Sequence, residues 1–170
     1  VSTKRWASSG SGFKTQVSVI VPVRNEGQNI SNLLNCLQKQ DYPSEKFEIV
    51  VVNDHSTDQT TEKVRAHAAG NVRMIELPPG RDGKKSALTE GIAQAKGSLI
   101  VTTDADCEMG GKWLSTLVAF YEKERPVMII APVLLRANKT FVSMLQRQEM
   151  FALLVCAGGS AYYNAPLLCS

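Results

Sequence analysis

Two aspartates separated by one residue, Asp104 and Asp106, follow the apolar segment 99–103. In an extended segment, side chains two residues apart point to the same side, roughly 6.5 Å apart along the chain. Two carboxylates placed in this way supply hard oxygen ligands for Mg²⁺ or Mn²⁺, which keep further positions for water and substrate phosphates. The alternative is a solvated turn with an aspartate cap, because the Asp-x-Asp pattern is common. We therefore treat Asp106 and Asp104 as candidate metal ligands.

Other polar residues follow other apolar segments. Asp54 comes directly after the segment 47–53. It is either a turn residue at the start of a helix, where Asp is favoured, or an acceptor for an N–H group of a nucleotide base. His55 beside it is interpreted as a turn residue. Lys84 and Lys85 begin a predicted helix, where basic residues are unfavourable. They are either solvated charges or partners of a bound diphosphate.

Strands that alternate with helices are predicted to position these residues. The strands are short runs rich in β-branched residues, apolar on both faces, at 17–23, 47–53, 72–77, 99–103 and 127–133. Apolar residues at helical spacing predict helices over 29–40, from a capping box at 56–59 to about 70, from 84 to a C-terminal Gly97, and over 113–123. This alternation predicts an α/β fold with a mostly parallel sheet and helices on both faces.

In such a sheet the C-terminal ends of all strands lie on one edge, and ligands bind there. The rule brings together the residues 22–26, Asp54 and the pair at 104 and 106, although about 50 residues of chain separate Asp54 from Asp104. We therefore expect several carboxylates and cations to meet at one edge of the sheet.

Composition excludes some classes of protein. The 170 residues are 44% hydrophobic and 21% charged, as in ordinary globular proteins. The excess of three basic residues (19 − 16) is matched by Lys4, Arg5 and Lys14, within a segment 1–15 that has no acid. We interpret 1–15 as a linker, tag remnant or juxtamembrane arm, and 16–170 as the domain. Residues 16–170 contain equal numbers of basic and acidic residues, which argues against a nucleic-acid partner.

Two phosphate-binding motifs fail on spacing. Gly83 and Lys84 are not followed directly by the Ser or Thr of a P-loop, and no Gly-x-Gly-x-x-Gly follows the segment 17–23. A P-loop NTPase and a hydride-transferring enzyme are therefore disfavoured.

Taken together, these segments resemble the catalytic domain of glycosyltransferase family 2, which has the GT-A fold. The matching pieces are 17–22 with Arg24-Asn25-Glu26, then 52–58, then Gly83-Lys84 with Ala87-Leu88 and Gly91-Ile92, and finally Asp104-Ala105-Asp106. They cover about residues 16–119. The resemblance implies a Rossmann-like nucleotide-binding half and transfer of a sugar from a UDP-linked donor to an acceptor hydroxyl, with inversion and a divalent cation.

The resemblance also implies roles for single residues. Donor binding would fall to Pro22, Val23, Arg24, Glu26, Asp54, Lys84, Asp104 and Ala105. Asp54 would accept a hydrogen bond from a uracil-type base, and Lys84 would lie near the sugar or diphosphate. Asp106 would be the principal ligand of Mg²⁺ or Mn²⁺, with Asp104 on the ribose and metal side. The cation would stabilise the departing nucleoside diphosphate.

The family's later acidic residue, the expected general base, has no match up to Ser170. We therefore expect the base beyond Ser170 and an incomplete acceptor part.

The Pro-x-Arg-Asn-Glu variant at 22–26 is similar to that of membrane-attached members. No apolar run reaches the ~20 residues of a membrane span. We expect the protein to lie at the cytoplasmic face of a membrane, attached through segments outside this chain. We expect its acceptor to be a glycan, lipid or polymer.

Two alternatives stay open. A sugar-phosphate nucleotidyltransferase would need a glycine-rich loop bearing Arg or Lys straight after 17–23, where the sequence offers Gly27 alone. A non-catalytic nucleotide-binding domain is favoured by the missing base and disfavoured by the retained Asp104 and Asp106.

Overall fold

The structure is a computed structural model that describes residues 12–68 and 70–131, together with residues 133, 144, 145, 148, 149 and 152. Its chain divides into two compact units, Val1–Arg125 and Pro126–Ser170. All of the strands and helices named below belong to the first unit. Within the described ranges, every helix falls short of the length and hydropathy of a membrane span.

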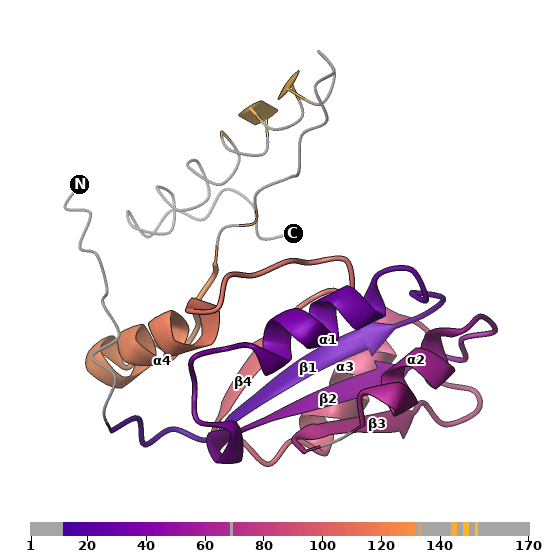
Figure 1. The fold of residues 1–170 in the computed structure, drawn as a ribbon, viewed down its shortest axis with the longest axis horizontal. Coiled ribbons are helices and arrows are strands. Elements are labelled where there is room, and N and C mark those ends of the chain that lie inside the picture. The colour runs from indigo at the N-terminus through magenta and orange to yellow at the C-terminus, as the bar shows by residue number, and fades with distance from the viewer. Residues whose placement is uncertain are drawn as a thin grey trace. The chain divides into compact units, whose positions relative to one another are not determined.

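Four parallel strands form one sheet in the order β3-β2-β1-β4 (Figure 1). They are β1 (Val17–Val23), β2 (Phe47–Asn53), β3 (Val72–Glu76) and β4 (Leu99–Thr102). β1 pairs with β2 on one side and with β4 on the other. The chain adds β2 and β3 outward in one direction and then places β4 on the opposite side of β1. The strand order therefore reverses next to β1, and ligands of open α/β sheets bind at such points.

Helices cover both faces of this sheet. They are α1 (Ile30–Gln38), α2 (Thr60–Ala66), α3 (Lys84–Ala93) and α4 (Trp113–Glu124), with a short 3-10 helix, η1, at Ser44–Lys46. One buried cluster joins the four valines at alternate positions of β1 to apolar residues of α1, α2 and α4. A second cluster joins Ile20 and Val52 to Ala87 of α3. Because successive strand residues point to opposite faces, α3 packs on the face opposite to the other three helices.

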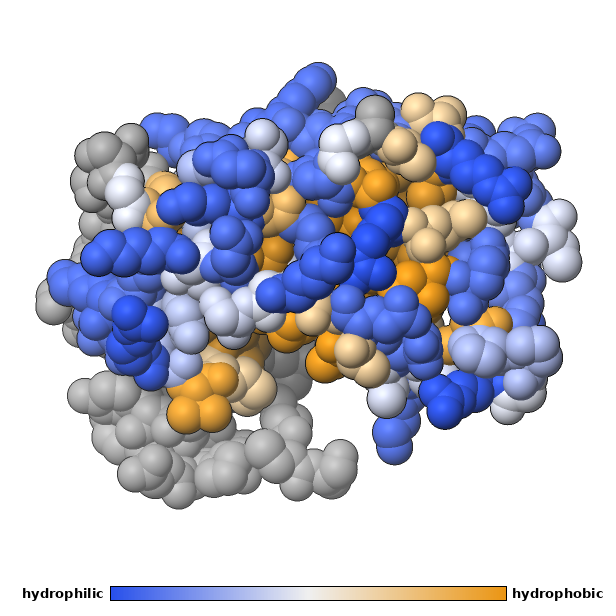
Figure 2. Space-filling view, turned by 90° about the horizontal axis from the view of Figure 1, so that it is seen from below, coloured by the Kyte–Doolittle hydropathy of each residue, from blue (hydrophilic) through white to orange (hydrophobic). Residues whose placement is uncertain are grey.

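The two faces are covered to different degrees. On α1, Ile30, Leu33, Leu34 and Leu37 follow helical spacing and are all fully buried. Burial of each such side chain contributes about 1.5–3 kcal/mol. The α3 cluster is smaller, with 5 buried residues against 17 in the other cluster among the residues that the structure describes. Figure 2 shows one face of the molecule on which hydrophobic residues reach the surface between hydrophilic ones.

A glycine allows α3 to approach the sheet closely. A Cβ atom at Gly91 would lie 2.5 Å from Cγ2 of Ile20 and 2.9 Å from Cγ2 of Val52. These distances are shorter than carbon atoms tolerate in a packed interior. The absence of a side chain at this position therefore sets the distance between α3 and the sheet.

The predicted α/β fold is confirmed, with parallel strands and helices on both faces. The strands at 17–23 and 47–53 have the predicted bounds, and those at 72–76 and 99–102 are each one residue shorter than predicted. The predicted strand at 127–133 is wrong, since residues 127–131 and 133 lie outside any strand. Val127 and Ile130 are exposed, and β-branched residues favour strands mainly through packing against neighbours.

Three predicted helix ends are also wrong, and one of them is the end of α2, which lies at Ala66 and not near residue 70. The capping box at 56–59 does not form, because the Ser56 hydroxyl accepts instead from the backbone N–H of Asn25 (3.0 Å). Asp58 takes its place at the start of α2, where Oδ1 accepts from the backbone N–H of Thr60 (2.9 Å). Gly97 does not end α3, which stops at Ala93. Gly97 lies instead against the backbone of β1.

We predict that Gly97→Ala destabilises the fold. Its Cβ would lie 2.4 Å from the backbone N of Ser18 and 2.5 Å from the carbonyl carbon of Val17, and neither backbone atom can move freely. We expect a loss of about 1–3 kcal/mol of unfolding free energy, measured by urea denaturation. Gly110→Ala is the matched control, because a Cβ there meets nothing within 4 Å. Equal stability of the two variants would contradict the close approach at Gly97.

Candidate functional site

A cavity of about 390 Å³ lies at the C-terminal edge of the sheet, beside the reversal of strand order. It is lined by all of the residues that the sequence suggested for donor and metal binding, together with Gly83 and Ala87. The suggested residues are Pro22, Val23, Arg24, Glu26, Asp54, Lys84, Asp104, Ala105 and Asp106. They come from the end of β1, the residue after β2, the start of α3 and the segment after β4. The structure therefore brings them together around one space.

Asp54 is the most buried charged residue of this cavity, with 4% of its surface exposed. Its Oδ2 accepts from the backbone N–H of Gly83 (3.0 Å) and from Nη1 of Arg24 (3.3 Å). Its Oδ1 is buried and has no hydrogen-bond partner among the described residues. A buried acceptor without a donor costs free energy. The arrangement is therefore suited to a ligand that brings an N–H or O–H group to Asp54.

The loops after β1 and β2 are tied to each other. The Asn25 side-chain oxygen accepts from the backbone N–H of Thr57 (2.9 Å), and Oδ2 of Asp58 accepts from the backbone N–H of Gly27 (3.0 Å). Asn25 has a positive φ of 56°, a conformation in which Asn is enriched among non-glycine residues. The hydrogen bond from the Thr60 side chain, and those from the Thr60 and Gly27 backbones, hold the pKa of Asp58 below its usual value. These contacts fix the positions from which Arg24 and Asp54 reach the cavity.

Lys84 and Asp104 form an ion pair at the rim of the cavity, with Nζ and Oδ1 2.6 Å apart. The two side chains are 61% and 51% exposed. Lys84 is the first residue of α3, as predicted, and Gly83 before it has a φ of 88° that suits glycine. The ion pair thus joins the start of α3 to the segment after β4.

The segment that holds Asp104 and Asp106 differs from the extended one assumed in the sequence analysis. β4 ends at Thr102, and the backbone N–H of Cys107 donates to the carbonyl of Asp104 (3.2 Å), so the chain turns here. Ala105 is buried, whereas Asp104 and Asp106 are exposed. The solvated-turn interpretation therefore describes the backbone correctly. Both carboxylates nevertheless line the same cavity.

A second group of possible cation ligands was missed by the sequence analysis. Single ligand atoms of Asp54, His55 and Asp82 all lie within 4.8 Å of one another. Asp82 lies in the loop between β3 and α3, about 28 residues from Asp54, and no regular spacing links it to the other two. Asp104 and Asp106 both line the cavity at the strand-order reversal, whereas His55 and Asp82 do not. The oxygen pair at 104 and 106 is therefore the better candidate for Mg²⁺ or Mn²⁺.

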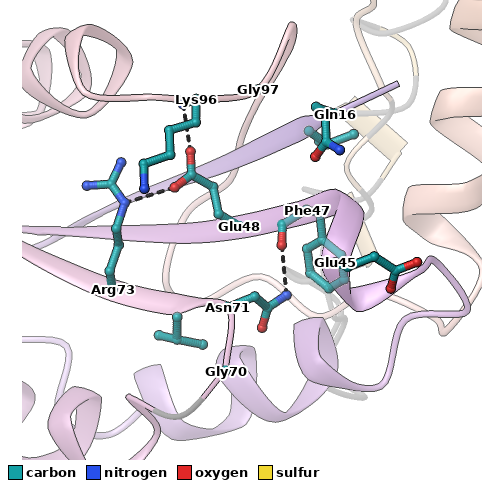
Figure 3. Close-up of a pocket in the computed structure, with 11 residues that line it drawn as sticks. Gln16, Glu45, Phe47, Glu48, Gly70, Asn71, Arg73, Lys96 and Gly97 are labelled. Carbon is teal, nitrogen blue, oxygen red and sulfur yellow. Dashed lines mark hydrogen bonds and ion pairs between the residues drawn. The ribbon is translucent and has the colours of Figure 1, made fainter. Parts of the chain in front are cut away.

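Another cavity, of about 260 Å³, lies at the opposite, N-terminal ends of the strands (Figure 3). Glu48 of β2 accepts there from the Ser18 hydroxyl (2.6 Å), Nε of Arg73 (2.8 Å) and the backbone N–H of Lys96 (2.7 Å). Burial raises the pKa of Glu48, but these donors outweigh it and hold the pKa below its usual value. The carboxylate is satisfied by the protein itself, so we assign it a structural role.

The fold and the cavity at the strand-order reversal define an α/β domain that binds its ligand at the C-terminal edge of a parallel sheet. The sequence model of glycosyl transferase family 2 matches residues 18–164. The chain belongs to this family, and the GT-A fold inferred from the sequence is confirmed.

Related proteins support this assignment. Over 100 residues, 58% of this chain, it is 37% identical to the glycosyltransferase AglE of Haloferax volcanii. It is similar to the crystal structure of residues 1–349 of Staphylococcus aureus TarS in complex with UDP-GlcNAc (TM-score 0.60, 35% identity, 65% of this chain and 32% of that one). It is also similar to the mannosyltransferase PcManGT of Pyrobaculum calidifontis in complex with GDP-Man and Mn²⁺ (TM-score 0.62, 34% identity, 70% of this chain and 36% of that one).

The chain spans only part of these relatives. It matches 33% of the length of AglE and 20% of the length of full TarS, a poly(ribitol-phosphate) β-N-acetylglucosaminyltransferase. The family match at residues 18–164 includes every residue that lines the cavity.

We predict that Glu48→Gln destabilises the protein at neutral pH by about 1–2 kcal/mol, because it removes a charge that accepts three hydrogen bonds. The folded-state pKa of Glu48 lies below its unfolded value of 4.5. The stabilisation is therefore fully present above the unfolded pKa and is lost as the pH falls through the folded one. Urea denaturation should show the two proteins converging in stability as the pH falls below about 4.5.

The matched control is Glu45→Gln, at an exposed position that lines the same cavity. This change should leave stability within about 0.5 kcal/mol of the wild type. A constant difference between wild type and Glu48→Gln from neutral to acidic pH would contradict the role given to the Glu48 charge.

Proposed function

We propose that this chain is the donor-binding part of a glycosyltransferase that moves a sugar from a UDP-linked donor to an acceptor hydroxyl. The observation that carries the proposal is the single cavity that joins Asp54, Lys84 and the pair Asp104 and Asp106. An acceptor for a base, a cation for phosphates and two ligands for a metal thus line the same space. The chain's membership of glycosyl transferase family 2 supports this arrangement of roles.

Asp54 is proposed to recognise the base. Its Oδ1 is a buried acceptor with no hydrogen-bond partner in the described part of the chain, and uracil offers an imide N–H beside two carbonyl groups. Arg24 is held beside Asp54 with a side chain that is 57% exposed, so its planar guanidinium group can stack on the base. The complexes of TarS with UDP-GlcNAc and of PcManGT with GDP-Man support a nucleotide-sugar ligand.

The start of α3 is proposed to receive the diphosphate. The first backbone N–H groups of a helix have no partner within the helix and favour anions. Lys84 adds a positive charge at this position and lines the cavity. An anionic ligand at this position would therefore explain why a lysine begins the helix, where its charge is unfavourable for the helix alone.

Asp106 and Asp104 are proposed to hold Mg²⁺ or Mn²⁺. The donor set fits such an ion, because both carboxylates are exposed hard oxygen ligands at the rim of the cavity. When bound, the ion would neutralise charge on the departing nucleoside diphosphate. Mn²⁺ in the PcManGT complex supports a divalent cation.

We also propose that transfer inverts the anomeric centre, with a carboxylate that deprotonates the acceptor hydroxyl. No described residue is assigned to this step. Attachment to the cytoplasmic face of a membrane through other segments is proposed from the residues 22–26 and the basic residues before Thr15. Cell fractionation of the full-length protein, with and without high salt, tests this location.

The nucleotidyltransferase alternative has less support. Gly27 is the glycine that follows β1, and its backbone N–H already donates to Asp58. This amide is therefore not available to bind a triphosphate. Release of pyrophosphate from a nucleoside triphosphate would favour that alternative over the proposed transferase.

We predict that UDP binds more tightly in the presence of Mn²⁺ and that Asp106→Asn removes this effect. Isothermal titration of UDP with and without Mn²⁺ measures both. We expect Mn²⁺ to strengthen UDP binding by about tenfold or more in the wild type, a coupling of order 1.4 kcal/mol. In Asp106→Asn we expect Mn²⁺ to strengthen UDP binding by less than about twofold, because one of the two metal ligands is lost.

Asp82→Asn is the matched control, since it removes a carboxylate from the group of Asp54, His55 and Asp82 and leaves the pair at 104 and 106 intact. It should retain the Mn²⁺ effect. Loss of the effect in Asp82→Asn and its retention in Asp106→Asn would move the metal site to the other group. A UDP affinity that changes neither with Mn²⁺ nor with these substitutions would refute the proposed donor site.

A further inference from the structure

We propose that Lys84 is an internal counter-ion that competes with the divalent cation for Asp104 until a donor binds. In the absence of nucleotide, the Lys84 ammonium group occupies Asp104, and the diphosphate of the donor then draws it away. This inference rests on the proposed function and adds how the two ligands influence each other. It makes the cation bind weakly to the free protein and tightly to the protein that holds a donor.

The ion pair occupies one of the two carboxylate oxygens of a proposed metal ligand. Nζ of Lys84 lies 2.6 Å from Oδ1 of Asp104, which is a full charge-assisted contact. Asp104 is one of the two carboxylates proposed as metal ligands, and both residues line the cavity. An ammonium group on Oδ1 and a divalent cation on the same oxygen repel each other, so the two cannot share it without cost.

The side chain of Lys84 can leave Asp104 while its backbone stays in place. The backbone is fixed by the preceding Gly83, whose N–H donates to the buried Asp54. The lysine side chain is 61% exposed and the Asp104 side chain 51% exposed. Ion pairs with this exposure contribute little to stability. The contact is therefore strong enough to bias the site and weak enough to exchange for a better partner.

A diphosphate is that better partner. It carries more negative charge than one carboxylate, and it is proposed to bind at the start of α3, where Lys84 begins the helix. Once Lys84 turns to the phosphates, both oxygens of Asp104 are available to the cation. Because linkage is reciprocal, a cation that takes Asp104 also favours binding of the diphosphate.

The neighbouring residue provides a control within the same helix turn. Lys85 is exposed and carries the same charge. It does not line the cavity, and the ion pair to Asp104 comes from Lys84. Lys84→Met and Lys85→Met remove the same charge from adjacent positions. They differ in whether the removed group contacts Asp104.

The experiment measures Mn²⁺ affinity from the EPR signal of free Mn²⁺, in the absence of nucleotide and with UDP saturating for each variant. Without UDP, we expect Lys84→Met to bind Mn²⁺ about two- to fivefold more tightly than the wild type, the range that an exposed ion pair allows. Lys85→Met should change the affinity by a smaller factor. With UDP, the gain of Lys84→Met should disappear, because the wild-type lysine no longer occupies Asp104.

A gain in Lys84→Met that is matched by Lys85→Met, or that persists with UDP, would mean general charge repulsion and would overturn the inference. So would the absence of any gain in a variant with unchanged circular dichroism. In these cases the wild type still binds UDP and Mn²⁺, and the proposed function stands. If the wild type binds neither ligand, the proposed function and the inference both fail. In an Asp104→Asn background, Lys84→Met should bring no gain, since the contact is already absent.

Discussion

The arrangement of the site depends on the parallel pairing of β1 with β2 and with β4. Parallel pairing places the C-terminal ends of these strands at the same edge, and the reversal of order next to β1 leaves room between the loops that follow them. Asp54, after β2, and Asp104, after β4, reach one cavity from opposite sides of β1. An antiparallel β4 would send its C-terminal end to the other edge, where Glu48 is already satisfied by its neighbours.

Much of this was predictable from the sequence, because buried strands and amphipathic helices leave periodic patterns. The bounds of β1 and β2 follow from such patterns, and the strand-edge rule brings residues 22–26, Asp54 and the pair at 104 and 106 to one edge. The prediction failed where one pattern had two physical meanings. Ser56 has the residue type of a helix cap but bonds to Asn25. Gly97 has the type that ends a helix but is required by contact with β1.

Other features left no local signal at all. The ion pair between Lys84 and Asp104, and the approach of Asp82 to Asp54 and His55, join segments that are distant in the chain and irregular in structure. One oxygen of Asp54 receives no hydrogen bond from the residues that the structure describes, and this depends on which donors the fold places near it. Such properties follow from three-dimensional placement, whereas residue type alone indicates only that an interaction is chemically possible.

The close packing at Gly91 has a consequence for how this protein and its relatives vary. The side chains of Ile20 and Val52 occupy the space that a Cβ at Gly91 would need. α3 carries Lys84 at its first turn, so the helix cannot move outward without shifting that lysine. Substitutions at these three positions are therefore expected to co-vary in evolution, with a larger residue in the helix accompanied by smaller ones in the strands.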